Sequence, residues 1–250
     1  MAEPLLSVER VSVRFGGLLA VNAASLSAPE GCITGLIGPN GAGKTTLFAI
    51  ISGFLKPDAG VIRYAGKNIT GEPPYRLARH GIARTFQIVQ SFAGLSVRDN
   101  ILVGAYLRHA SRAAALAVAQ QVGREVGLGD RLDQPADTLT VAGRKRLELA
   151  RVLATEPKLL LLDEVLAGLN PSEIRDILPV IRGLCARGIT IVMIEHVMQA
   201  VMQLSEHVFV LAEGRIIAAG SPSQVAADPA VVEAYLGHGA AAKLEAAHGS

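Results

Sequence analysis

The stretch GLIGPNGAGKTT, residues 35–46, has the spacing G-x-x-x-x-G-K-[ST] that is typical of a phosphate-binding loop. The apolar residues 33–37 predict a short buried strand before the loop, and the residues from Lys44 to about Gly53 predict a helix after it. Glycines let several backbone N–H groups of such a loop point inward, and the unpaired N–H groups of a helix N-terminus favour an anion. The stretch therefore predicts a P-loop that holds the β-phosphate of a nucleotide.

The side chains of this loop fit the same ligand. Lys44 is expected to reach the β- and γ-phosphate oxygens, the Thr45 hydroxyl to bind Mg²⁺, and Thr46 to contact the α-phosphate. A glycine-rich turn without a ligand is the alternative, and a chance match to the full pattern in a chain of this composition is rare, on the order of one in two hundred. The remaining loop residues expected to contact the nucleotide are Gly38, Pro39, Asn40, Gly41, Ala42 and Gly43.

The composition is that of a globular chain without a membrane-spanning segment. Its 250 residues, half of them apolar, suffice for one large domain or two small ones, and its net charge of +2 gives no general reason to expect nucleic acid as a partner. Cys32 and Cys185 are isolated, which argues against a disulfide framework or a metal site and fits a reducing compartment. The apolar runs are only as long as strands, and the N-terminus lacks a signal-peptide pattern. We therefore expect any membrane role to come through a partner protein.

Strand patterns alternate with helix patterns along most of the chain, which predicts an α/β fold with a mostly parallel sheet. Residues 5–27 are a β-rich N-terminal piece, and the helical pattern between about 96 and 154 predicts an inserted group of helices, the last of them over 144–154. A further helix is expected over 196–204. The Ala- and Gly-rich end, residues 237–250, is expected to be a flexible tail.

Two carboxylates follow a strand pattern that contains no charge. Residues 159–162, LLLL, predict a buried strand, and Asp163 and Glu164 come at its exit. Ligands of a doubly wound sheet bind at the carboxyl ends of its strands, so both side chains are expected beside the P-loop. Asp163 suits the Mg²⁺ shell through a water, and Glu164 suits a general base that polarises the attacking water. A strand that simply ends in charges would be the better interpretation of this pair alone, and the P-loop reverses that preference.

Gln87 and His196 occupy equivalent positions after two other strand patterns. Residues 82–86 look extended and end at Gln87, whose amide is a candidate ligand for Mg²⁺ or for the attacking water. Residues 189–194 predict a buried strand that brings His196 to the same sheet edge, where a neutral imidazole can contact the γ-phosphate and hold the water or Glu164. Either residue alone would be interpreted as structural. A catalytic role is favoured only because the P-loop and the Asp163-Glu164 pair are expected at the same sheet edge.

In this order the motifs resemble the ATP-binding subunits of ABC transporters, and the similarity runs from about Leu5 to Gly237. Walker A is GPNGAGKTT at 38–46, the Q-loop is TFQ at 85–87, Walker B is LLLLDE at 159–164, the D-loop is AGLN at 167–170, and the H-loop is His196. Three longer segments are similar to the LivG-type subunits of branched-chain amino-acid importers: GIARTFQ at 81–87, AGLNPSE at 167–173 and IEHVMQAVM at 194–202.

The resemblance implies a single ABC ATPase domain over 1–236. Its RecA-like core and N-terminal antiparallel β subdomain would span about 1–88 and 155–236, with an α-helical subdomain inserted at about 89–154. By the same resemblance, Phe15 stacks on the adenine of ATP, although a strand position equally permits an ordinary core aromatic.

The resemblance also implies the partners of the chain. Two ATP-binding subunits, as a homodimer or a heterodimer, would sandwich ATP and Mg²⁺ head to tail. They would associate with two permease subunits at the cytoplasmic face of a bacterial inner membrane, and indirectly with a periplasmic solute-binding protein. Nucleic acid is not an expected partner.

One motif departs from the family pattern. The signature, usually of the form Leu-Ser-Gly-Gly-Gln, aligns with residues 139–143, where Thr140 keeps a hydroxyl and Ala142 replaces a glycine. The added methyl group either weakens the approach to the γ-phosphate of the opposite subunit's ATP or is accommodated, because alanine adopts helical dihedrals readily. We favour a working motif that uses Thr140, Ala142 and Gly143, chiefly through backbone N–H groups.

Two rival functions lie outside transport, and a third set of alternatives lies within it. A soluble ABC ATPase acting on DNA or ribosomes would typically contain tandem cassettes, long coiled-coil insertions or zinc motifs, and the sequence has none of these. A P-loop kinase or GTPase is disfavoured by His196 and by the signature-like segment. Within transporters, amide or urea import and lipopolysaccharide export stay open, because a motor subunit never touches the solute.

Overall fold

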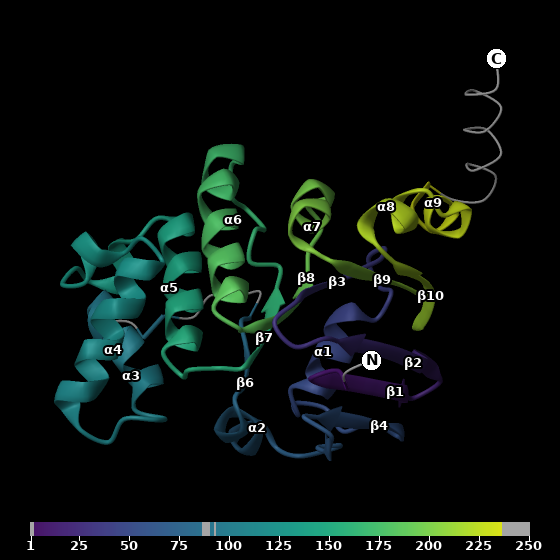
Figure 1. The fold of residues 1–250 in the computed structure, drawn as a ribbon, viewed down its shortest axis with the longest axis horizontal. Helices are drawn as coiled ribbons and strands as arrows, with labels where there is room; N and C mark the ends of the chain where they lie inside the picture. Colours follow the sequence, from purple (N-terminus) through teal and green to yellow (C-terminus); the bar gives the residue numbers. More distant parts are fainter. Residues whose placement is uncertain (1–2, 87–90, 93, 237–250) are drawn as a thin grey trace.

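The computed structural model describes residues 3–86, 91–92 and 94–236, and its described strands form two sheets (Figure 1). The larger sheet has the order β10-β9-β3-β8-β7-β6, and the smaller has the order β2-β1-β4-β5. This arrangement confirms the predicted α/β fold. Gln87 and the tail at 237–250 lie outside the described residues.

The larger sheet is parallel apart from its last pair. Every residue of β3 (Ile33–Ile37), β7 (Leu159–Asp163) and β8 (Thr190–Ile194) is buried, as expected for strands covered on both faces. These strands pair in parallel with one another, with β6 (Ile82–Arg84) and with β9 (His207–Ala212). Their carboxyl ends therefore meet at one edge of the sheet.

The smaller sheet is antiparallel and covers the P-loop helix. Its strands are β1 (Leu6–Phe15), β2 (Leu18–Ala28), β4 (Ala59–Tyr64) and β5 (Lys67–Asn68). One apolar core joins Val8 and Leu26 of this sheet, Phe48 of α1 (Lys44–Ile51), and Leu161 of β7. The N-terminal β-rich piece thus packs over the P-loop helix and the adjoining face of the larger sheet.

The helices α3 (Val97–Ala105), α4 (Arg112–Glu125) and α5 (Val141–Leu153) pack together on the side of the molecule away from α8 (Pro222–Ala226) and α9 (Pro229–Leu236) (Figure 1). A second core joins their apolar residues to α6 (Pro171–Ala186) and to the other face of the parallel sheet. Within the described residues, no helix has the length and apolar character needed to cross a bilayer.

Two helix starts differ from those predicted. The last inserted helix begins at Val141 rather than Arg144, because the Thr140 hydroxyl accepts a hydrogen bond from the Gly143 N–H and caps an extra turn. The helix α7 (Met198–Leu204) begins after His196, which therefore lies in the connection that follows β8. The spacing of apolar residues could not locate either start. The first turn of α5 is partly exposed, and His196 lines a cavity instead of lying in a helix.

Two predicted helix boundaries are confirmed. Asn170 caps α6 in a capping box, in which its side chain accepts from the N–H of Glu173 and the Glu173 carboxylate accepts from the N–H of Asn170. The short helix α2 (Pro74–His80) opens with a proline and ends at Gly81, as its sequence predicts.

Candidate active site

The P-loop connects β3 to α1 at the carboxyl edge of the parallel sheet. Gly38 and Gly43 have φ values of 149° and 102°, which favour glycine. A Cβ atom at Gly38 would collide with the carbonyl oxygen of Leu211, and one at Gly43 with that of Ala20. The pattern of glycines is therefore required by how closely β9 and β2 approach the loop.

Lys44 is buried and folded back onto the loop that precedes it. Its Nζ donates to the carbonyl oxygens of Gly38 at 2.8 Å and Pro39 at 2.9 Å. Burial lowers the pKa of Lys44, and the nearby carboxylates of Glu164 and Asp163 oppose this shift. A phosphate oxygen at this position would give the ammonium group a charged acceptor in place of neutral carbonyls.

A cavity of about 590 Å³ opens at the P-loop and brings together most of the predicted site residues. Phe15 is half exposed and lines this cavity, so it is not an ordinary core aromatic. The lining residues are Phe15, Leu18, Leu19, Ala20, Asn40, Gly41, Ala42, Gly43, Lys44, Thr45, Thr46, Glu164, His196, Glu213 and Gly214.

Part of this lining is absent from the sequence predictions. Residues 18–20 of β2 and the turn at 213–214 line the cavity beside the loop. The Gly214 N–H donates to the carbonyl oxygen of Ala42 at 3.0 Å, which fixes the turn against the loop. Nothing local in the sequence marks either segment as part of a site, because only the packing of the two sheets brings them there.

Glu164 and His196 lie on neighbouring strand ends and contact each other. Nε2 of His196 is 2.7 Å from Oε1 of Glu164. An ionised carboxylate only accepts hydrogen bonds, so the imidazole donates from Nε2 in this pair. The Glu164 N–H donates to the carbonyl oxygen of Ile194 at 2.9 Å, and this bond across β7 and β8 places both side chains at the cavity.

Glu164 also has a strained backbone. Its φ of 51° lies in the left-handed region, which costs a non-glycine residue about 1–2 kcal/mol. Lys145 of α5 donates from Nζ to the Glu164 carbonyl oxygen at 3.0 Å. The strained peptide is thus held on its N–H side by β8 and on its carbonyl side by α5.

Asp163 is buried and paired with an arginine that the sequence motifs had not assigned to the site. Nη2 of Arg84 is 2.7 Å from Asp163 Oδ2, and the Asp163 N–H donates to Thr85 Oγ1 at 3.0 Å. Oδ1 of Asp163 is buried without a hydrogen-bond partner among the described residues. This free carboxylate oxygen and the Thr45 hydroxyl at the cavity are hard oxygen ligands, so the residues present fit Mg²⁺.

Glu195 holds the backbone immediately before the D-loop. Its Oε1 accepts from the Leu166 N–H at 2.9 Å, and its side chain is buried. Burial raises the pKa of Glu195 to about 7, and the negative charge of Glu164 adds to the shift. The sequence pattern predicts that Glu195 follows the strand at 189–194, but it does not predict this contact with Leu166.

The signature segment does not join this cavity. Thr140 is exposed and caps α5, Ala142 is partly buried and Gly143 is buried. None of these three residues is among those that line the P-loop cavity. The chain therefore presents two separate surfaces, a P-loop cavity and the N-terminus of α5.

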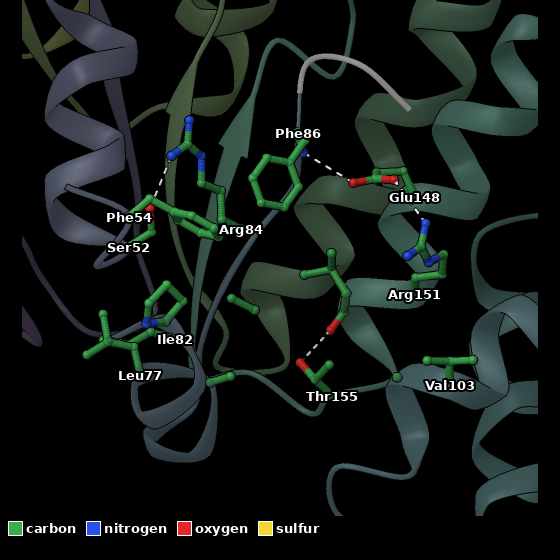
Figure 2. Close-up of a pocket in the computed structure, with 15 residues that line it drawn as sticks. Ser52, Phe54, Leu77, Ile82, Arg84, Phe86, Val103, Glu148, Arg151 and Thr155 are labelled. Carbon is green, nitrogen blue, oxygen red and sulfur yellow. Dashed lines mark hydrogen bonds and ion pairs between the residues drawn. The ribbon is translucent and has the colours of Figure 1, made fainter. Parts of the chain in front are cut away.

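A second cavity, of about 280 Å³, lies between α2, β6 and the helices α3 and α5 (Figure 2). The rings of Phe54 and Phe86 meet edge to face in its wall, with their centroids 5.4 Å apart. The Phe86 N–H donates to Glu148 of α5 at 3.2 Å, and burial raises the pKa of Glu148. We call this cavity the aromatic groove.

Comparison with known families matches two segments of the chain. The family described as "ABC transporter" matches residues 21–167, and the family described as "Branched-chain amino acid ATP-binding cassette transporter" matches residues 215–241.

Individual relatives are similar over nearly the whole chain. A high-affinity branched-chain amino acid transport ATP-binding protein, BraF of Pseudomonas aeruginosa, is 39% identical, covering 95% of this chain and 99% of its own. The LivG protein of Escherichia coli K12 is 38% identical, covering 95% of this chain and 99% of its own.

Solved structures with the same arrangement include two ATP-binding cassettes of ABC transporters. A nucleotide-free cassette is 33% identical with a TM-score of 0.86, covering 94% of this chain and 99% of its own. A cassette in its ADP conformation is 33% identical with a TM-score of 0.85, covering 95% of this chain and 100% of its own.

Proposed function

The chain belongs to the ATP-binding subunits of ABC transporters, and on that premise we propose that it hydrolyses ATP to drive import of branched-chain or related amino acids. The observation that carries the hydrolytic part is the contact between His196 and Glu164, 2.7 Å apart at the wall of the P-loop cavity. The class of solute rests on the match at residues 215–241 and on the named relatives.

The proposed cofactors are ATP and Mg²⁺. The loop N–H groups and Lys44 would hold the phosphates, and Phe15 would stack on adenine. Thr45, Asp163 and Gln87 would hold the metal, which when bound neutralises charge on the β- and γ-phosphate oxygens.

In the proposed reaction, Glu164 accepts a hydrogen bond from the attacking water and takes its proton as the oxygen bonds to the γ-phosphorus. The bond from that phosphorus to the bridging oxygen breaks, so ATP and water become ADP and phosphate. His196 keeps the Glu164 carboxylate in place through Nε2 and lines the cavity into which the γ-phosphate would extend. The fixed peptide of Glu164 limits the reorganisation that this step requires.

A second ATP-binding subunit would complete the site. The exposed N-terminus of α5 at Thr140 offers unpaired N–H groups to an anion, and it lies outside the cavity of its own subunit. A head-to-tail dimer places this helix end over the partner's ATP. Closure on ATP and opening after hydrolysis would then power transport.

We further propose that the permease subunits dock at the aromatic groove, which lies between the core and the inserted helices (Figure 2). The half-exposed side chains of Phe54 and Phe86 give this surface the aromatic character that interfaces favour. The subunit would thus be peripheral at the cytoplasmic face of the membrane. We also propose that the helices at about 89–154 form a separate subdomain. This subdomain would move against the core formed by about 1–88 and 155–236.

Reconstitution tests this function directly. The chain is assembled in liposomes with a candidate permease pair and a candidate solute-binding protein, and phosphate release is measured with and without leucine. We expect leucine-loaded binding protein to stimulate release several-fold and to drive uptake of labelled leucine. Stimulation by an amide or by urea instead would reassign the solute, and ATP consumption without any response to the permease pair would contradict a transport function.

A further inference from the structure

Arg84, the last residue of β6, lies between the aromatic groove and the P-loop site. Its side chain is 8% exposed, although the residue lines the groove. Nη2 donates to Asp163 Oδ2 at 2.7 Å, and Nη1 donates to Ser52 Oγ at 3.1 Å. Ser52 caps the carboxyl end of the P-loop helix, where its hydroxyl also bonds to the Phe48 carbonyl oxygen. One guanidinium therefore ties the Walker B carboxylate to the far end of α1, and its bond to Ser52 is drawn in Figure 2.

The same guanidinium lies against the aromatic wall of the groove. Its central carbon is 5.4 Å from the ring centroid of Phe86 and 5.8 Å from that of Phe48. Phe86 is 42% exposed and meets Phe54, which is 56% exposed. A chain segment seated in the groove would thus press on the ring against which Arg84 rests.

The two residues after Arg84 strengthen the connection to both sides. The Thr85 hydroxyl accepts from the Asp163 N–H, and the Thr85 N–H donates to Leu161 of the same strand. The Phe86 N–H is held by Glu148 of α5. Residues 84–86 therefore bind the Walker B strand on one side and the inserted helices on the other, so a shift of the groove wall reaches Asp163 through direct contacts.

We propose that Arg84 is a positioning residue that orients Asp163 for the Mg²⁺ shell and transmits occupation of the aromatic groove to it. The inference rests on the proposed function, because it takes the permease as the occupant of the groove. Arg84 holds Oδ2 and leaves the buried Oδ1 as the free oxygen of that carboxylate. The guanidinium binds the hydroxyl and the carboxylate through separate nitrogens while its face rests on a ring, and a lysine ammonium lacks this planar fork.

Arg84→Lys tests the positioning role in the isolated subunit. Binding of a fluorescent ATP analogue is titrated with Mg²⁺, and we expect the half-maximal Mg²⁺ concentration to rise about five- to twenty-fold, with binding in EDTA unchanged. The control is Arg98→Lys on α3. Arg98 also pairs with an aspartate, and its Nη1 lies 2.7 Å from Oδ1 of Asp133. Arg98→Lys should leave the Mg²⁺ dependence as in the wild type.

The transmission role is tested in the assembled transporter. The ratio of phosphate release with the permease pair to release without it should fall at least five-fold in Arg84→Lys. It should also fall in Phe86→Leu, which keeps the pair with Asp163 and removes the ring, so its Mg²⁺ dependence should stay unchanged. Phe86→Leu also decides the transmission role if Arg84→Lys does not fold, and Ser52→Ala then tests positioning through a smaller rise in the Mg²⁺ requirement.

The outcomes separate the two proposals. A wild-type subunit that the permease pair does not stimulate contradicts the proposed function, whatever the variants do. A stimulated wild type together with an Arg84→Lys variant that keeps both its Mg²⁺ dependence and its stimulation ratio overturns the inference. A variant with a lower melting temperature and lower activity but the same ratio and Mg²⁺ dependence also overturns it, because Arg84 would then be only structural.

Discussion

Lys145 of α5 donates from Nζ to the backbone carbonyl of Glu164 at 3.0 Å, so the helix that begins at the signature segment touches the peptide of the proposed catalytic base. Lys145 is itself buried. In a head-to-tail dimer, the N-terminus of this helix would face the partner's ATP while Lys145 holds the site of its own subunit. In the proposed dimer, this contact would directly link the two nucleotide sites.

Replacing Lys145 by methionine should slow hydrolysis while leaving ATP binding intact. The strained Glu164 peptide loses its carbonyl-side hydrogen bond, a contact to a charged donor worth about 1.5–3 kcal/mol. We expect phosphate release to fall roughly ten-fold, with the affinity for a fluorescent ATP analogue within two-fold of the wild type. Arg146→Met is the matched control, because Arg146 of the same helix donates to a backbone carbonyl elsewhere, that of Val126 at the end of α4. Equal losses in both variants would remove the special role of Lys145.

Replacing Lys44 by alanine should abolish tight nucleotide binding. The loss of a charged hydrogen-bond donor to the phosphates corresponds to about 10- to 100-fold in affinity. Lys158→Ala is the control, since Lys158 is an exposed lysine before β7. Calorimetry with ATP measures both, and unaltered binding by Lys44→Ala would contradict the assignment of the loop.

Ala142→Gly restores the residue type that the ABC signature usually has at this position. We expect phosphate release by the assembled transporter to change by less than about two-fold, because backbone N–H groups of α5 are the proposed contacts. A small loss of thermal stability should accompany the change, since glycine in a helix costs about 1 kcal/mol relative to alanine. A many-fold gain in activity would show that the natural motif is impaired.

Glu195 should make stability fall as the pH rises. The raised native pKa, about 7 against an ordinary 4.5, means that the native state holds a proton which the unfolded state releases above about pH 4.5. The stabilising effect is therefore complete below pH 4.5 and is lost as the pH rises through 7. Over this window the wild type should lose about 1–3 kcal/mol relative to Glu195→Gln, whose amide oxygen can still accept from the Leu166 N–H. Denaturant unfolding at pH 5 and pH 8 measures the difference, and parallel curves for the two proteins would contradict the shifted pKa.

The fold and the P-loop cavity were predictable from the sequence because their signals are local. Glycine spacing, an uncharged strand followed by Asp163 and Glu164, and the cap at Asn170 each lie within a dozen consecutive residues. The contacts that fix the site could not be predicted in this way. Arg84 meets Asp163 across 79 positions and Lys145 meets the Glu164 carbonyl across 19, and only the packing of β6 and α5 against β7 creates these pairs.

The start of α5 could not be predicted correctly even though its cap is a local feature. Thr140 has the residue type of an N-cap, yet the exposed first turn has no apolar period, so the helix was predicted to begin three residues later. The partner that we propose for the Thr140 surface is a second chain, so no local pattern in this sequence could predict that contact.

Glu164→Gln tests most directly whether this chain hydrolyses ATP with Glu164 as the base. The variant is given ATP and Mg²⁺ in the assembled transporter, and bound nucleotide and released phosphate are measured in the same sample. We predict ATP binding at least as tight as in the wild type, phosphate release lowered by about 100-fold or more, and a trapped closed dimer. Turnover at the wild-type rate would contradict the account, because the proton would then be accepted by another group.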